Sequence, residues 1–141
     1  MEEQQETIKT TSASYSSDHG RRKEASARVR LFKGKGQNLI NDKPMEEYFP
    51  GIVSVSRLKK VFEITKTEGK FYATIKVKGS GKNSQLEAVI HSLARVIAKQ
   101  EPELRTIVKK AGFLTRDARV KERRKYGNAQ KARKGKQSPK R

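Results

Sequence analysis

The side chains in this sequence whose type and spacing best suit a chemical task are the cations at its C-terminal end. From residue 123 to residue 141 the chain has nine lysines and arginines and no acidic residue. They are Arg123, Arg124, Lys125, Lys131, Arg133, Lys134, Lys136, Lys140 and Arg141. Ammonium and guanidinium groups bind phosphate oxygens well. This segment therefore predicts binding to a polyanion, which would order a stretch too polar to fold alone.

Positive charge is not confined to this end. The 141 residues include 34 lysines and arginines against 15 acidic residues, a formal net charge of +19. Residues 1–20 carry a net charge of −3 and residues 111–141 carry +10, so residues 21–110 keep +12. Self-repulsion of this size destabilises a compact chain, and a polyanionic partner would relieve it. The middle of the chain is therefore predicted to take part in the same binding.

Other kinds of functional site have few residues to use. The chain has no cysteine, and its two histidines, His19 and His91, stand in unrelated contexts, so we expect no metal site and no cofactor. We interpret His91 and Arg95, four residues apart, as a surface or boundary pair of a helix rather than as catalytic residues. The sequence shows neither a long apolar run nor a signal-peptide pattern, so we expect a soluble intracellular protein with no membrane partner.

A glycine-rich loop at residues 79–83 has the composition of a phosphate-binding loop. It fails the pattern G-x-x-x-x-G-K-[ST] twice, because Lys76 stands at the first glycine position and Asn83 at the hydroxyl position. The glycines at residues 34–36 likewise fail to complete G-x-G-x-x-G. Both clusters predict tight turns, although backbone N–H groups before a helix remain able to meet a phosphate.

The elements that position the cations begin with a strand at residues 25–31. Its apolar residues are Ala25, Ala27, Val29 and Leu31, and they alternate with Ser26, Arg28 and Arg30. Arginines on an outer strand face are usually only solvated. Here Glu24 is the one local acid among five cations, so we favour phosphate binding by this face.

The remaining elements follow in order. We expect residues 38–40 to form a short strand that pairs back on residues 25–31 as a hairpin. Asp42 is expected to cap a short helix at residues 45–49. Residues 55–62 have helical spacing of apolar side chains, and residues 71–77 alternate like a strand.

The strongest helix is predicted from residue 84 to residue 97. Ser84 and Glu87 have the spacing of a capping box, and Leu86, Val89, Ile90, Leu93 and Ile97 form one apolar stripe. Pro102 and Gly112 are expected to begin and end another helix. Phe113 and Leu114 are expected to anchor the tail, which is predicted to be partly helical at residues 115–127 and extended afterwards.

These elements predict three regions. Residues 1–19 are expected to be a disordered acidic and polar N-terminal extension. Residues 20–114 are expected to form a globular α+β RNA-binding domain with one modest core. Residues 115–141 are expected to be a basic C-terminal extension.

In their order and spacing, these motifs resemble the family of small-subunit ribosomal protein nine. The resemblance runs from residue 15 to residue 141. Its anchors are GRRK at 20–23, ARVRL at 27–31, Asn41, Pro44, EEYF at 46–49, His91 with Ala94 and Arg95, KAGFLTRD at 110–117, and the terminal Lys140 and Arg141. The residues before position 15 have no counterpart in the family.

The resemblance implies a fold and a role. The fold is an α+β domain whose four-stranded sheet packs against helices, as in the second domain of small-subunit ribosomal protein five, with a long extended basic C-terminal tail. The role is that of a structural constituent of the small-subunit head in the cytoplasm, which binds 16S-type rRNA beside neighbouring head proteins. The tail is implied to reach the anticodon stem-loop of the peptidyl-site tRNA. No enzymatic activity is implied.

Candidate site residues follow from the basic motifs and the resemblance together. Those expected to bind rRNA are Arg21, Arg22, Lys23, Arg28, Arg30, Arg116, Arg119, Arg123, Arg124, Lys125, Lys131, Arg133 and Lys134. Those expected to bind tRNA are Ser138, Lys140 and Arg141. The alternative function is a free, non-specific RNA- or DNA-binding or annealing protein that owes its affinity to charge alone.

Overall fold

Three long strands form where side chains alternate between the two faces of a sheet. The computed structural model describes residues 14–135. Its long strands are β1 (Tyr15–Arg22), β2 (Ala25–Lys33) and β5 (Phe71–Lys78), and the strands β3 (Leu39–Ile40) and β4 (Lys43–Pro44) have two residues each. The alternation predicted at residues 25–31 and 71–77 is confirmed, with Val29 and Ile75 buried and Arg28 exposed.

The strands form one five-stranded mixed sheet in the order β1-β2-β5-β3-β4. β1 and β5 flank β2 in antiparallel pairing, β3 is parallel to β5, and β4 is antiparallel to β3. The predicted hairpin between residues 25–31 and 38–40 is wrong, because β1 and β5 occupy both edges of β2. The predicted four strands become five with the short edge strand β4.

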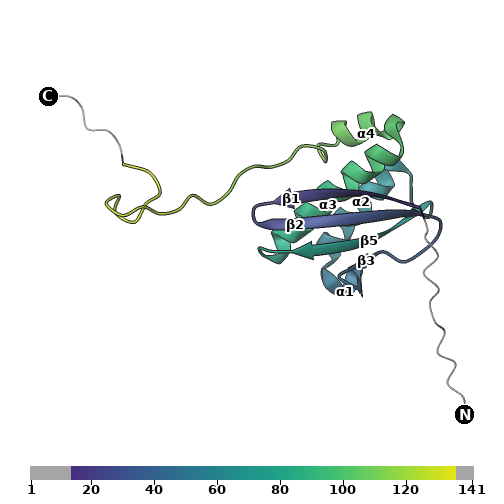
Figure 1. Ribbon diagram of the computed structural model, residues 1–141, viewed down its shortest axis with the longest axis horizontal. Helices are drawn as coiled ribbons and strands as arrows, with labels where there is room; N and C mark the ends of the chain where they lie inside the picture. The colour runs from purple at the N-terminus through teal and green to yellow at the C-terminus, as the bar shows by residue number, and fades with distance from the viewer. Residues whose placement is uncertain (1–13, 136–141) are drawn as a thin grey trace, which may run out of the picture.

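Two long helices, α2 (Ile52–Thr65) and α3 (Lys82–Gln100), cover one face of this sheet (Figure 1). The shorter elements are α1 (Met45–Tyr48), the 3₁₀ helix η1 (Pro102–Leu104) and α4 (Arg105–Lys110). Apolar side chains of the sheet and the helices meet in one core, in which Leu58, Ile75 and Leu93 are fully buried. The predicted α+β class is confirmed. Among the described residues, no helix covers the other face of the sheet.

Two predicted helix caps are wrong. α3 begins at Lys82, so Ser84 lies inside its first turn, is buried, and makes no capping hydrogen bond. α1 has Pro44 at its N-cap, and Asp42 lies 2.6 Å from the Lys76 ammonium instead. Asp42 therefore pairs with a side chain of β5 rather than with a backbone N–H group at the start of α1.

β1 corrects the predicted boundary of the domain. Residues 1–19 were expected to be disordered, but residues 15–19 are the first part of this strand. The strand is hard to recognise because the side that faces α3 is polar. The polar contacts across this seam include Ser16 with Gln100, Asp18 with Arg95 at 3.1 Å, Arg95 with the His19 carbonyl at 2.7 Å, Arg22 with Glu87 at 2.6 Å, and Lys99 with the Ser17 carbonyl at 3.1 Å.

Gly20 sets how closely β1 approaches α3. A Cβ atom at this position would lie far inside van der Waals contact of the Ala88 carbonyl oxygen and the Ser92 backbone nitrogen. Both neighbours are backbone atoms of α3 and cannot turn aside. A glycine is therefore required here by the close approach of two backbones rather than by an unusual φ.

The chain leaves the domain after α4. Gly112 ends the helical segment with φ +80°, and Phe113 packs against the core, so the predicted anchor is confirmed for Phe113. Residues 116–125 form neither helix nor strand; residues 117–119 still contact Arg22 of β1, and the chain then runs away from the domain (Figure 1). The predicted partly helical form of residues 115–127 is wrong, because so short and polar a segment has too little packing to hold a helix. Residues 136–141 lie outside the described residues.

Candidate nucleic-acid interface

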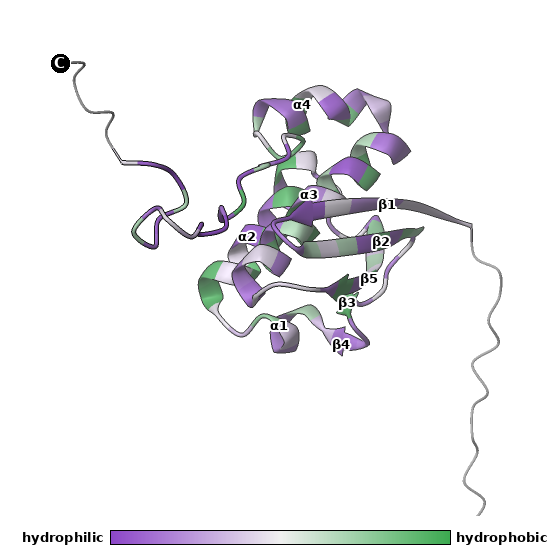
Figure 2. Ribbon diagram, turned by 60° about the vertical axis from the view of Figure 1, so that its left-hand side comes forward, coloured by the Kyte–Doolittle hydropathy of each residue, from purple (hydrophilic) through white to green (hydrophobic). Residues whose placement is uncertain are grey.

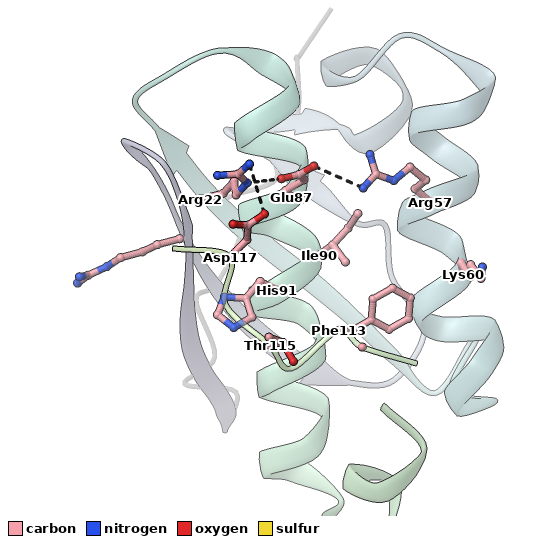
Figure 3. A pocket seen from close by; sticks show the side chains of 11 residues that line it. Arg22, Arg57, Lys60, Glu87, Ile90, His91, Phe113, Thr115 and Asp117 are labelled. Atoms are coloured by element: carbon pink, nitrogen blue, oxygen red, sulfur yellow. Dashed lines mark hydrogen bonds and ion pairs between the residues drawn. The ribbon is translucent and has the colours of Figure 1, made fainter. Parts of the chain in front are cut away.

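Arg22 lies at the point where the tail leaves the domain (Figure 3). Its Nε donates to Glu87 Oε2 at 2.6 Å, its Nη2 lies 3.4 Å from Asp117 Oδ2, and its Nη1 donates to the Arg119 carbonyl at 2.7 Å. The side chain is only 11% exposed. These contacts join β1, α3 and the first residues of the tail. Arg22 therefore positions the tail, and two carboxylates already occupy the guanidinium that the sequence assigned to phosphate.

A cavity of about 320 Å³ opens beside this junction, between α2, α3 and the residues after α4. Arg57 and Lys60 of α2 lie on one side of it and Arg22 and Asp117 on the other, with Phe113 and Thr115 below them (Figure 3). Arg57 Nη2 is 3.8 Å from Glu87 Oε1. Lys60 has no ion pair within the described residues, so its ammonium group is available to an anionic ligand in this cavity.

His91 also lines this cavity and is half-buried. Burial lowers its pKa, and the charges of Arg95 and Arg116 act in the same direction, while the Leu114 backbone opposes them. Among the described residues, its buried Nδ1 has no hydrogen-bond partner. The structure therefore favours the neutral imidazole at the base of the tail. The interpretation of His91 as a boundary residue agrees with this position.

Arg21 and Arg22 point to opposite faces of the sheet, as neighbours in a strand must. Arg21, Arg28 and Arg30 are exposed on the face that no described helix covers, and Lys23 is exposed in the turn between β1 and β2. Within the described residues Arg21 and Arg28 form no ion pair, whereas the Arg30 guanidinium lies 5.2 Å from the centre of the Tyr15 ring. This face therefore offers free cations.

The described part of the tail carries most of the other predicted residues. Two of them are paired within the tail: Arg119 Nη2 lies 2.7 Å from Asp117 Oδ2, and Arg133 Nε lies 2.8 Å from Glu122 Oε2. These hydrogen bonds hold the pKa of both carboxyl groups below their usual range. The tail cations that are exposed and have no ion pair to a described residue are Arg116, Arg123, Arg124, Lys125, Lys131 and Lys134, together with Lys121, which was not among the predicted residues.

The tail turns back on itself at residues 125–131. The Lys125 N–H donates to the Lys131 carbonyl at 3.1 Å, and the Lys131 N–H donates to the Asn128 carbonyl at 3.0 Å. Tyr126 is fully exposed at this turn. Figure 2 shows the tail mostly in the colour of hydrophilic residues. The three residues predicted to bind tRNA, Ser138, Lys140 and Arg141, lie outside the described residues.

The glycine loop at residues 79–83 is a tight turn. Gly79 has φ +85°, and its backbone lies against the Glu24 carbonyl. The Lys82 Nζ lies 3.4 Å from the centre of the Tyr48 ring and donates to the Tyr48 carbonyl at 3.3 Å. Lys82 therefore fastens α3 to α1 and is not directed at a nucleotide.

In residues 14–135, no three side chains of the types that bind metal ions come together. No helix in that range has the length and apolar character to span a bilayer.

Two explanations for the exposed cations were given from the sequence: a ribosomal protein, and a free protein that binds nucleic acid through charge alone. Comparison with known proteins bears on this choice. Residues 20–141 match the family model described as ribosomal protein S9/S16. The chain belongs to this family. The small ribosomal subunit protein uS9 of Solidesulfovibrio magneticus is 49% identical to it over 108 residues, which are 77% of this chain and 83% of that protein. The corresponding protein of Maridesulfovibrio salexigens is 47% identical over the same share of each chain.

Membership of the ribosomal protein S9/S16 family confirms the resemblance found in the sequence. Proteins of this family are structural and not enzymes. The match includes the residues of the tail beyond residue 135, so the tail belongs to the family's pattern. Residues 15–19, the first part of β1, precede the match.

Several residues of the interface were missed in the sequence. Glu87 and Asp117, the partners of Arg22, lie 65 and 95 positions further along the chain, and no local pattern joins them to it. Only the structure shows that strand parity places Arg22 and the buried Gly20 on the same side of β1, facing α3. The exposed cations Lys76 and Lys78 could have been identified from the alternation at residues 71–78.

Proposed function

We propose that this protein is a structural constituent of the head of the small ribosomal subunit, where it binds 16S-type rRNA. The observation that carries the proposal is the exposure of cations on two separate parts of a family member: the open face of the sheet and residues 116–134. Both named relatives are small-subunit proteins of bacteria. Bacterial ribosomes are cytoplasmic, which gives the location.

The mechanism is electrostatic and structural. Lysines and arginines neutralise RNA phosphates, release condensed counterions, and allow RNA helices to lie closer together than their charges would otherwise permit. Most cations of the described tail are exposed without an ion pair, so the tail can contact RNA phosphates along its length. No covalent bond is made or broken.

The end of the tail is proposed to reach the peptidyl-site tRNA, with Ser138, Lys140 and Arg141 at its anticodon stem-loop. Nineteen extended residues from Arg123 onward span at most about 65 Å. A thin tail of this length connects a docked domain to a distant functional centre where a second domain would not fit. The paired contacts of Arg22 fix the place from which the tail starts.

Deletion of Lys140 and Arg141 tests this part of the proposal. Small subunits reconstituted with the shortened protein are expected to assemble normally and to bind peptidyl-site tRNA less tightly, with a weaker dependence on salt. The matched control replaces Lys131 and Lys134 by glutamine, which removes two charges and keeps the end of the tail. Equal tRNA affinity for the deletion and for the full chain at several salt concentrations would rule out the tRNA contact.

A further inference from the structure

We propose that the open face of the sheet contains a binding site for the sugar–phosphate backbone of RNA, formed by Arg21, Arg28, Lys76 and Lys78. This inference rests on the proposed function and names a specific surface for it. Lys76 and Lys78, on β5, are not among the residues that the basic motifs suggested. The site is a depression of about 430 Å³, which these four cations line together with His19 and Ser26.

The register of β2 and β5 places two like charges, those of Arg28 and Lys76, directly opposite one another. Arg28 of β2 pairs with His19 of β1 on one side and with Lys76 of β5 on the other. The next row contains Arg21, Ser26 and Lys78 in the same order. Like charges opposite each other across antiparallel strands are destabilising. The facing pair of Arg28 and Lys76 therefore disfavours the free fold, and a bound anion would offset that repulsion.

Few carboxylates offset this charge. Asp42 pairs with Lys76 at 2.6 Å, and both side chains are well exposed. Asp18 lies 3.6 Å from the His19 imidazole but belongs to the inner side of β1, where it pairs with Arg95. Within the described residues, Arg21, Arg28 and Lys78 have no ion pair. The depression therefore keeps a positive charge that a polyanion neutralises.

The aromatic residues of the same face show which part of RNA binds here. Tyr15, Phe32 and Tyr72 form the row at the far end of the three strands. The Phe32 and Tyr72 rings stack with their centres 5.1 Å apart, and the Tyr15 ring lies 5.6 Å from Phe32. A base would need a free ring face to stack on.

Both ends of the aromatic row are already covered. The Arg30 guanidinium lies over Tyr15, and the backbone of Gly36 lies so close to Tyr72 that a Cβ there would be 2.6 Å from the ring. Bases are therefore not expected to stack on this row. The phosphate backbone remains as the part of RNA that the adjoining cations fit, and the partner is an RNA helix or strand recognised by charge and shape.

The first test compares two triple variants of the full chain for binding to a transcript of the 3′ head domain of small-subunit rRNA. Arg28→Gln, Lys76→Gln and Lys78→Gln remove three charges from the depression. Lys66→Gln, Lys109→Gln and Lys110→Gln remove three exposed charges elsewhere on the domain. The first variant is expected to bind more weakly, with a slope of log affinity against log salt reduced by about two to three. The second is expected to keep most of the slope.

Thermal unfolding of the same variants separates binding from folding. Removing the facing charges of Arg28 and Lys76 is expected to leave the melting temperature unchanged or to raise it, while the affinity for RNA falls. If the wild-type chain itself does not bind the transcript, the proposed function fails. If the wild-type chain binds and the two triple variants have the same affinity and salt slope, only the sheet-face site fails.

The second test locates the RNA directly. The chain has no cysteine, so Ser26→Cys gives one attachment point inside the depression for an iron chelate that generates hydroxyl radicals. In reconstituted small subunits, radicals from position 26 are expected to cut the rRNA at a few discrete nucleotides. The unmodified chain treated with the same reagent is the control. Assembly without cuts from position 26 would show that solvent or another protein covers this face, and would overturn the proposal.

Discussion

Two adjacent arginines show how much depends on the face to which a single side chain points. Arg21 and Arg22 are residues of the same type, but neighbours in a strand point to opposite faces. Arg21 therefore lies on the open face of the sheet and Arg22 between β1 and α3. Arg22 meets two carboxylates and a carbonyl, and Arg21 meets none of these in the described residues. We infer that Arg22 contributes to stability and to the direction of the tail, and Arg21 to binding.

Substitution of each arginine by methionine tests this division. Arg22→Met keeps the aliphatic stem and leaves Glu87 without its closest cation, so the free energy of unfolding is expected to fall by about 1–3 kcal/mol. Arg21→Met is expected to change it by less than about 0.5 kcal/mol and to weaken rRNA binding. Urea unfolding and a binding titration measure the two effects. Equal destabilisation by both substitutions would contradict the assignment.

His91 predicts a dependence of stability on pH. Burial lowers its pKa in the folded state, whereas the unfolded chain takes up the proton at the ordinary value of about 6.5. The unfolded state therefore binds more protons between the lowered pKa and about 6.5, and stability falls as the pH decreases through that window. In a His19→Gln background, adding His91→Gln is expected to flatten the curve of unfolding free energy from pH 7 to pH 5. An unchanged curve would exclude this role.

At the scale of elements, the sequence predicted those whose buried side is apolar. The alternation at residues 25–31 and 71–77 and the apolar stripe at residues 86–97 correspond to β2, β5 and α3. β1 was missed because its buried side consists of polar residues and a glycine, whose partners are distant in sequence. The pairing of residues 25–31 with residues 38–40 was mispredicted because β1 and β5 pair with β2 instead. No local pattern in the sequence indicates which strands take these two positions.

The candidate site was predictable to a similar extent. Composition alone identified the cations, and parity identified Arg28 and Arg30 as outward-facing residues. The distinction between a free cation such as Arg28 and an occupied one such as Arg22 needs the tertiary structure. The same holds for the cluster of Arg21, Arg28, Lys76 and Lys78, because the register of β1, β2 and β5 brings these residues together.

The start of the tail behaves as part of the domain, and two truncations test this. A chain ending at residue 120 keeps Asp117 and the Arg119 carbonyl, whereas one ending at residue 115 loses both contacts with Arg22. The longer truncation product is expected to unfold at the same urea concentration as the full chain. The shorter one is expected to be less stable by about 1 kcal/mol. Identical midpoints for the two would show that the contacts do not hold the tail.

At the scale of the whole molecule, the net charge of +19 predicts that salt has opposite effects on two properties of the protein. Salt is expected to stabilise the free chain against unfolding and to weaken its binding to rRNA. Salt screens repulsion among exposed cations, so the melting temperature of the free chain is expected to rise between about 0.01 and 0.15 M salt. Affinity for rRNA is expected to fall over the same range. Thermal unfolding monitored by circular dichroism measures the first effect. A melting temperature that falls with added salt would show that attraction between opposite charges dominates instead.

The central claim is that the exposed lysines and arginines of the open sheet face and of the tail attach the protein to one place on the small ribosomal subunit. Sedimentation with purified small subunits lacking this protein tests the claim most directly, at a series of salt concentrations and with a DNA duplex of similar length as competitor. We predict one copy of the chain on each particle, retained at moderate salt and in the presence of the DNA. Release at moderate salt, or displacement by the DNA, would contradict the claim and identify a free module that binds nucleic acids through charge alone.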